Sequence, residues 1–260
     1  MAYINRDGVR IHYRVVGDGP PLVLHHGASQ DLRRWYLCGY VEALRSEYQL
    51  ILVDPRGNGA SDKPHEPAAY ALRRRAEDVV GVLEDVGVRA AAFWGYSDGG
   101  RVGFGLAKYA PEYLTALVVG GHHPYEYRVP EHLRMNGHDP EDCVDKLLTA
   151  IKADPARLPP LGRKVLLAND FLALAAAQQD EPSLEDVLPQ MRMPCLLYGG
   201  ERDVDYQAIR EGARLIPGAD FFSLPDLDHA FTFSSSPLVL PHVVEFLRRV
   251  NQPVLTAVGL

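Results

Sequence analysis

The sequence predicts an α/β protein in which a parallel sheet carries helices on both faces. Two observations lead to this fold class. Short apolar runs alternate with stretches of helical periodicity over most of the 260 residues, a pattern typical of βαβ units. Most of these runs are also apolar throughout, which indicates strands in a sheet that is covered on both sides.

The predicted strands are short and end at turn signals. Residues 9–16 alternate between polar and apolar side chains, as a half-exposed strand does, and a turn rich in glycine and proline follows. Buried strands are predicted at residues 22–26, 50–54, 90–96, 114–121, 195–200 and 221–225.

The predicted helices lie between and after these strands. Residues 68–86 contain no proline, place apolar side chains at helical spacing and are followed by a glycine. A helix of about three turns follows the strand at 90–96 and reaches Tyr109. The last helix spans residues 238–250 despite an internal proline, and we expect residues 251–260 to form a loosely held tail.

Residues 122–190 break the alternation of strands and helices. This stretch is rich in Pro, His, Asp and Glu, has no strand pattern and is typical of several short helices, most clearly at 141–153 and 163–179. We therefore predict a sheet domain formed by residues 1–121 and 191–260, with a small helical cap inserted at 122–190.

Charge and composition exclude several classes of protein. The 27 basic and 34 acidic residues give a net charge of −7, so we expect no nucleic acid or membrane partner and a neutral small-molecule substrate. No apolar run approaches the ~18 residues of a transmembrane helix, and the N-terminus lacks the layout of a signal peptide. We expect a cytoplasmic protein, and we interpret the basic run at residues 73–75 as a solvated helix face.

No metal or cofactor site is predicted. The three cysteines form no Cys-x-x-Cys pair. Histidine pairs occur at 25–26 and 122–123, but neighbouring residues on a strand point to opposite faces, and no His-x-His or His-Glu-x-x-His pattern accompanies them. No Gly-x-Gly-x-x-Gly opens a helix after a strand, so a nucleotide cofactor is not indicated either.

The motif Gly-x-Ser-x-Gly occurs where a buried strand ends and a helix begins, at Gly95-Tyr96-Ser97-Asp98-Gly99. In this context the serine occupies a strained turn that lifts its hydroxyl above the sheet. The glycines on either side let the strand and the helix pass closely. We interpret Ser97 as a catalytic nucleophile; the simpler alternative is a serine that caps the helix.

A serine nucleophile needs a base, and the base needs an acid that orients it. His229 alone among the ten histidines lies in the loop between the last predicted strand and the last predicted helix; the alternative for it is an exposed loop histidine. Asp203 follows the strand at 195–200, with Asp205 as a rival and a helix cap as another possible role. The order Ser97, Asp203, His229, each after a predicted strand, predicts a catalytic triad.

Acyl transfer also requires hydrogen-bond donors for the oxyanion. The N–H of Asp98 lies at the N-terminus of a predicted helix, where the helix dipole favours negative charge. The N–H of Ala28, in the loop after the strand at 22–26, is the second predicted donor.

Together these segments make the chain resemble an α/β-hydrolase of the small-cap serine esterase or lactonase type over nearly its whole length. The residues that carry the resemblance are His26-Gly27-Ala28, Asp54-Pro55-Arg56-Gly57-Asn58-Gly59-Ala60-Ser61, the turn at Ser97, Gly200-Glu201-Arg202-Asp203 and His229. The resemblance implies an eight-stranded, mostly parallel sheet with the cap inserted after the sixth strand.

The resemblance also implies several roles for individual residues. The run from Asp54 to Ser61 is expected to be architectural. The cap is expected to wall a rather apolar substrate pocket, with Tyr125, Tyr127 and Phe171 as candidates; ordinary packing within the cap is the alternative for each. The family commonly has glycine before the histidine, where this chain has Asp228. A carboxylate close to His229 would raise the pKa of the imidazole, but we expect Asp228 to be an ordinary solvated residue.

The predicted function is a cofactor-independent serine hydrolase that acts on a small, partly apolar carboxylic ester or lactone. Serine at the turn argues against dehalogenase and epoxide hydrolase chemistry, which needs a carboxylate there to form an alkyl ester. Carbon–carbon bond hydrolysis and perhydrolysis use the same triad and stay open. A receptor or signalling protein of the same fold is the alternative from another class.

Overall fold

The computed structural model describes residues 2–153, 156 and 160–252. Their eight-stranded sheet has the order β1-β2-β4-β3-β5-β6-β7-β8. The pairs β1–β2 and β2–β4 are antiparallel, and the other pairs are parallel. The strands are β1 (Ala2–Arg6), β2 (Val9–Val16), β3 (Pro21–His25), β4 (Gln49–Asp54), β5 (Ala91–Tyr96), β6 (Leu114–Gly120), β7 (Cys195–Gly200) and β8 (Asp220–Leu224). The predicted fold class, a mostly parallel eight-stranded sheet flanked by helices, is confirmed.

Strand β1 is the one that the sequence prediction missed. It lies at the edge of the sheet and is joined to β2 by a tight turn in which Asp7 and Gly8 both have positive φ, 53° and 81°. An Asp-Gly pair between two alternating runs is a strong signal for such a hairpin. That signal was present in the sequence and would have located the strand.

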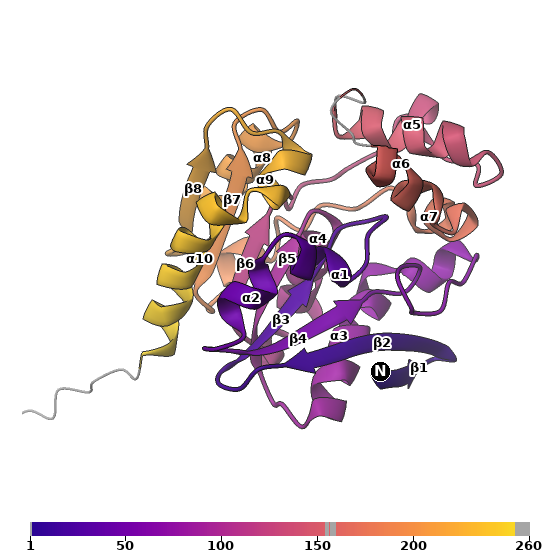
Figure 1. Cartoon of the computed structure of the whole chain (residues 1–260). Coiled ribbons are helices and arrows are strands. Elements are labelled where there is room, and N and C mark those ends of the chain that lie inside the picture. The colour runs from indigo at the N-terminus through magenta and orange to yellow at the C-terminus, as the bar shows by residue number, and fades with distance from the viewer. Residues whose placement is uncertain (1, 154–155, 157–159, 253–260) are drawn as a thin grey trace, which may run out of the picture.

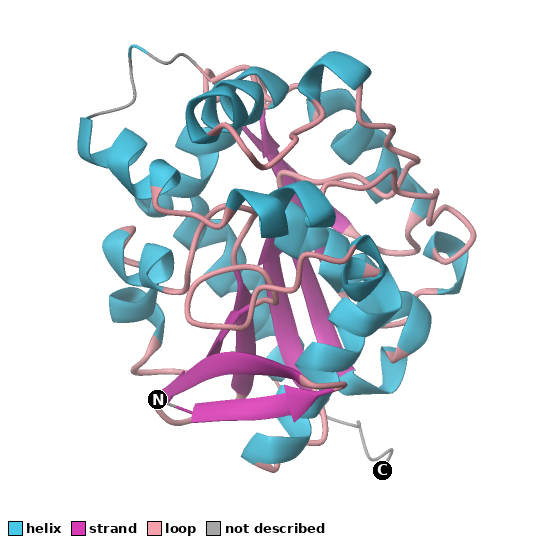
Figure 2. Ribbon diagram, turned by 90° about the vertical axis from the view of Figure 1, so that its right-hand side faces the viewer, coloured by secondary structure: helices cyan, strands magenta, loops and turns pink. Residues whose placement is uncertain are grey.

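Helices cover both faces of the sheet (Figures 1 and 2). One face packs against α3 (Leu72–Val86), α4 (Asp98–Tyr109) and α8 (Tyr206–Leu215). The other packs against α1 (Arg33–Leu37), α2 (Tyr40–Leu44), α9 (His229–Ser234) and α10 (Ser236–Asn251). Short 3₁₀ helices are η1 (Pro67–Tyr70), η2 (Pro111–Tyr113), η3 (Glu131–Leu133) and η5 (Leu188–Gln190).

The segment between β6 and β7 contains α5 (Pro140–Ala150), α6 (Pro160–Leu167) and α7 (Phe171–Ala177), which lie together beside the sheet in Figure 1. Helices α5 and α7 form a small apolar cluster, against which Leu166 and Leu167 of α6 pack; its members are Cys143, Val144, Leu148, Phe171 and Leu174. The single helix predicted at 163–179 is wrong: it is divided into α6 and α7 because the Asp170 side chain accepts the N–H of Ala173 and begins a new helix.

Two further expectations concern the end of the chain and membranes. The last helix continues to Asn251, and residues 253–260 of the predicted tail lie outside the described residues.

In the described part of the chain, no helix combines the length and the apolar character that crossing a bilayer requires.

The strand register brings the loops that follow the parallel strands to one edge of the sheet. His25 lies opposite Gly95, and Tyr96 lies opposite Gly120, so the loops after β3, β5 and β6 leave the sheet side by side. Gly200 lies opposite Leu224 at the same edge. This is the edge at which open α/β sheets bind their ligands.

Candidate active site

Ser97 occupies a sharp turn between β5 and α4. Its φ of 55° and ψ of −123° are unusual for a residue with a side chain, and such strain is typical of functional positions. The turn depends on its glycines: a Cβ on Gly95 would lie 2.2 Å from the carbonyl oxygen of Gly99. The predicted strand-to-helix turn at Ser97 is therefore present.

His229 hydrogen-bonds to both Ser97 and Asp203. Its Nε2 lies 2.9 Å from Ser97 Oγ, and its Nδ1 lies 2.8 Å from Asp203 Oδ2. A carboxylate can only accept, so Nδ1 carries the proton and Nε2 is free to accept the proton of the Ser97 hydroxyl. The Asp203 side chain is completely buried, and His229 is nearly so. The structure thus brings all three predicted residues together in the predicted order.

Asp205 has a different partner from Asp203. Its backbone N–H donates to Asp203 Oδ1 at 3.1 Å, which fixes the second oxygen of that carboxylate. Its own carboxylate faces His123, with 3.6 Å between Oδ1 and Nε2. The geometry therefore selects Asp203 over Asp205 as the residue that orients His229.

The pKa of His229 is raised above its ordinary value. Burial acts to lower it, but the negative charge and hydrogen bond of Asp203 outweigh burial, and the charges of Asp205 and Asp228 add to the effect. Asp228 is the N-cap of α9, where its side chain accepts the N–H of Phe231 at 2.8 Å. The residue that departs from the family pattern thus caps the helix on which His229 lies.

Tyr96 contacts His229 through both its hydroxyl and its ring. Its buried hydroxyl donates to the backbone carbonyl of His229 at 2.5 Å, and its ring packs against the His229 and Phe233 rings. The sequence prediction gave Tyr96 no role. Its position next to Ser97 in the motif was a signal for contact with the site, but the distant partner could not be read from the sequence.

The two predicted oxyanion donors belong to segments next to Ser97. A Cβ on Gly27, the residue before Ala28, would lie only 3.0 Å from the Ser97 Cβ. The N–H of Asp98 is the first of α4 and has no carbonyl partner within the helix.

Arg75 corrects the interpretation of the basic run at residues 73–75. Arg73 and Arg74 are exposed, as expected, but Arg75 is buried and forms an ion pair with Asp98, the residue that follows the nucleophile. A second buried arginine, Arg101, pairs with Glu181 at 3.1 Å. Helix α3 therefore contributes a positive charge next to the site.

The three cap residues predicted for the substrate pocket lie in different surroundings. Phe171 packs in the interior of the cap. Tyr125 is half-buried and lies against the His123 ring, with 5.8 Å between ring centroids. Tyr127 forms a backbone bridge with Glu181, through hydrogen bonds of 2.9 and 2.7 Å.

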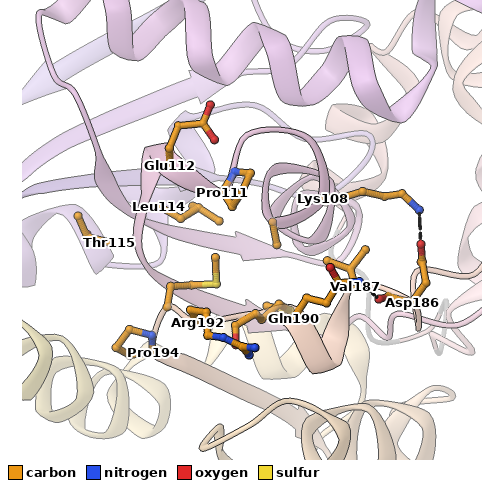
Figure 3. Close-up of a pocket in the computed structure, with 13 residues that line it drawn as sticks. Lys108, Pro111, Glu112, Leu114, Thr115, Asp186, Val187, Gln190, Arg192 and Pro194 are labelled. Atoms are coloured by element: carbon orange, nitrogen blue, oxygen red, sulfur yellow. Dashed lines mark hydrogen bonds and ion pairs between the residues drawn. The ribbon is translucent and has the colours of Figure 1, made fainter.

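A pocket of about 850 Å³ is lined by the end of α4 and the segment before β7 (Figure 3). Its lining includes Lys108 in the last turn of α4, whereas Ser97 precedes the first turn, and an ion pair of 3.0 Å joins Lys108 to Asp186. We do not assign the chemistry to this pocket because it holds none of the predicted residues. Across the described residues, no three His, Cys, Asp or Glu side chains are grouped in a way that could hold a metal ion.

Comparison with known proteins places the chain in a family. Residues 20–165, more than half of the chain, match the family described as alpha/beta hydrolase fold. A cis-3-alkyl-4-alkyloxetan-2-one decarboxylase from Shewanella oneidensis is 33% identical over 119 residues, 45% of this chain and 37% of that protein. The AB hydrolase superfamily protein YfhM from Bacillus subtilis is 31% identical over 197 residues, 71% of this chain and 64% of that protein.

The chain thus spans less than two thirds of the length of both relatives. Among solved structures, an enol-lactonase from Burkholderia xenovorans has a TM-score of 0.81 and 24% sequence identity, with 95% of this chain and 100% of that chain covered. This likeness concerns the fold. The sheet order, the turn at Ser97 and the family match agree, and the chain belongs to the α/β hydrolase fold family.

Proposed function

We propose that this chain is a cofactor-independent serine hydrolase that cleaves small carboxylic esters or lactones through an acyl-enzyme. The observation that carries the proposal is the continuous hydrogen-bonded series from Ser97 Oγ through His229 to Asp203, with distances of 2.9 and 2.8 Å. These groups have the polarity that activation of a serine hydroxyl requires.

In the acylation half of the reaction, Ser97 Oγ attacks the substrate carbonyl carbon while its proton passes to His229 Nε2. The carbonyl electron pair moves to the oxygen, which the N–H groups of Ala28 and Asp98 stabilise. When the carbonyl re-forms, the bond to the leaving alcohol breaks and the alcohol takes the proton from His229. Asp203 keeps the ring oriented and stabilises its charged form.

In the second half, water replaces the alcohol. His229 Nε2 takes a proton from the water, whose oxygen attacks the acyl carbon, and the same N–H groups hold the oxyanion. Breakdown of this intermediate releases the carboxylic acid and returns the proton to Ser97 Oγ. No redox step or cofactor is needed, because the bonds broken and formed differ only by the addition of water.

The proposed substrate is neutral and partly apolar. Arg75 and Arg101 are already paired with the carboxylates of Asp98 and Glu181, so neither arginine is free to bind an anionic substrate. An anionic substrate would also be repelled by the net charge of −7. Serine at the turn gives no alkyl-ester route to epoxide opening.

A hydrolysis screen tests the proposal. We expect turnover of p-nitrophenyl esters of varied acyl length, or of lactones, and a loss of at least about 10⁴-fold in kcat in Ser97→Ala. Ser46→Ala, at an exposed serine, is the matched control and should keep full activity. Tight binding of such compounds without turnover would instead support a receptor and contradict the proposal.

A further inference from the structure

His25 ends β3, and His26 begins the loop that follows; both are buried, and each hydrogen-bonds to a backbone carbonyl group of this segment. His25 Nδ1 lies 3.1 Å from the carbonyl oxygen of His26, and His26 Nδ1 lies 2.8 Å from that of Gly27. A carbonyl oxygen can only accept, so each Nδ1 carries a proton and donates it. Each imidazole therefore holds the carbonyl group of the residue that follows it.

The bond from His26 bears on the predicted oxyanion donor. The carbonyl of Gly27 and the N–H of Ala28 belong to one planar, trans peptide unit and point in opposite directions. A donor on the Gly27 oxygen therefore fixes the direction of the Ala28 N–H. Because Gly27 lies against Ser97, that direction is fixed relative to the nucleophile.

The Asp54 carboxylate lies next to the other nitrogen of the His26 ring. Its Oδ1 lies 3.4 Å from His26 Nε2, an ion-pair distance without the alignment of a full hydrogen bond. The carboxylate is itself fixed by the Leu32 and Ala60 N–H groups at 2.7 and 2.9 Å and by His12 Nδ1 at 2.8 Å. Burial opposes its ionisation, but the contacts with His26, Ala60 and His12 keep the pKa of Asp54 below its usual range.

The segment that carries the second predicted oxyanion donor, the Asp98 N–H, packs against His25 and His26. A Cβ on Gly99 would lie 2.3 Å from the His25 carbonyl oxygen and 2.8 Å from that of His26. The first turn of α4, which carries the Asp98 N–H, therefore packs directly on the backbone of His25 and His26.

We propose that His26, packed beside the Asp54 carboxylate, is a positioning residue that aims the Ala28 N–H at the oxyanion formed when Ser97 attacks. The inference rests on the proposed function and adds to it a second imidazole–carboxylate pair, one that acts on the oxyanion site rather than on the nucleophile. His26 itself touches neither substrate nor reacting atoms.

Two substitutions at one position separate this role from plain packing. The amide nitrogen of Asn is two bonds from Cβ, as Nδ1 of His is, so His26→Asn can still donate to the Gly27 carbonyl. The amide nitrogen of Gln is three bonds from Cβ, as Nε2 is, so His26→Gln loses that donor. We expect His26→Asn to keep kcat within about 5-fold and His26→Gln to lower kcat by about 10²-fold, with KM within about 3-fold.

A tetrahedral inhibitor gives a readout that packing alone would not move. The affinity for a trifluoromethyl ketone, whose adduct with Ser97 carries an oxyanion, should fall in His26→Gln in parallel with kcat. His132→Gln, the same substitution at an exposed histidine, is the matched control, and its kcat should stay within about 3-fold. Full activity of a folded His26→Gln, or equal losses in both His26 variants, would overturn the inference.

A second test uses the wild-type protein and therefore does not depend on whether the variants fold. Nuclear magnetic resonance should find a proton on His26 Nδ1 coupled to the Gly27 carbonyl, and a downfield shift of the Ala28 amide proton in the ketone adduct. A bare Nδ1 or an unmoved Ala28 amide would overturn the inference. If the wild type neither turns over esters nor forms the adduct, the proposed function itself has failed, whereas the Nδ1 measurement still tests the contact.

Discussion

Three carboxylates around His229 set the pH range in which its imidazole can act as a base. Asp203 contacts the ring directly, and Asp205 and Asp228 add negative charge nearby, so the pKa of His229 lies above its ordinary value although burial opposes this. Only the neutral ring can take the serine proton. In the proposed mechanism, the acid limb of the kcat/KM profile should therefore reflect the protonation of His229 in the free enzyme.

Removing the charge of Asp205 should move that limb. Asp205→Asn takes away a negative neighbour, the charged form of His229 loses stabilisation, and we expect the acid limb of kcat/KM to shift toward lower pH. Asp226→Asn is the control: this residue is exposed, pairs with Arg202 and has a φ of 60° that Asn tolerates. An unmoved limb in Asp205→Asn, or a shift toward higher pH, would refute the electrostatic assignment.

Substitutions of Asp203 and Asp205 should differ in their effects on kcat. Asp203→Asn removes the acceptor of the His229 Nδ1 proton and favours the wrong tautomer, so kcat should fall by roughly 10³–10⁴-fold. Asp205→Asn keeps that acceptor and should change kcat by less than about 10-fold at a pH above the acid limb. Steady-state kinetics at such a pH decide between them, and the reverse order would move the acid of the triad to Asp205.

At the scale of elements, the ion pair between Arg75 and Asp98 joins α3 to the start of α4. The Arg75 side chain is 8% exposed and the Asp98 side chain 27%. Burial acts to raise the pKa of Asp98, but Arg75 outweighs it and the pKa is lowered. A charged residue directly after the nucleophile is thus compatible with the fold because another helix supplies the opposite charge.

Arg75→Met should destabilise the fold. It leaves the partly buried carboxylate of Asp98 without its partner, and we expect the free energy of unfolding to fall by about 3 kcal/mol at pH 7. Arg75→Met/Asp98→Leu should recover most of the loss, whereas Arg74→Met, at an exposed neighbour, should change it by less than about 0.5 kcal/mol. Urea denaturation measures all three, and equal effects at positions 74 and 75 would contradict the account.

The sign of the pH dependence gives a further check on the same variant. The pKa of Asp98 is lowered in the folded state, so the ion pair contributes fully above the ordinary value of 3.8 and its contribution is lost as the pH falls through the folded value. The gap between wild type and Arg75→Met should therefore narrow below that pH.

The helices and strands differ in how well their bounds could be predicted from the sequence. Strands β2 and β7 begin and end at the predicted residues, because their apolar runs are bounded by turn signals. Helices α1, α2 and α9 were missed because they have only five or six residues, too few to show a helical period. The pair between Arg75 and Asp98 could not be predicted, because it joins separate helices that only the tertiary fold brings together.

The candidate site was more predictable than the helices around it. Ser97, Asp203 and His229 each follow a strand, and a parallel sheet gathers the ends of its strands at one edge, so their order along the chain was sufficient to place them together. The supporting contacts of Tyr96 and His26 depend on side-chain orientation, which neither spacing nor composition specifies.

At the scale of the whole molecule, the net charge of −7 should favour neutral substrates. We expect kcat/KM for an anionic ester to be lower than for a neutral ester of equal length, and to rise as salt screens the repulsion between about 0.01 and 0.15 M. The neutral ester should show little salt dependence. A salt-independent or falling kcat/KM for the anionic ester would contradict a role for the overall charge.

The central claim is that Ser97 is a working nucleophile, and covalent labelling tests it most directly. A fluorophosphonate forms a stable phosphonyl ester with an activated serine, so intact-protein mass spectrometry should find one label per chain, and peptide mapping should place it on Ser97. Ser97→Ala should take up no label, while Ser46→Ala should be labelled like the wild type. Labelling that persists in Ser97→Ala, or a wild-type chain that takes up none, would contradict the account.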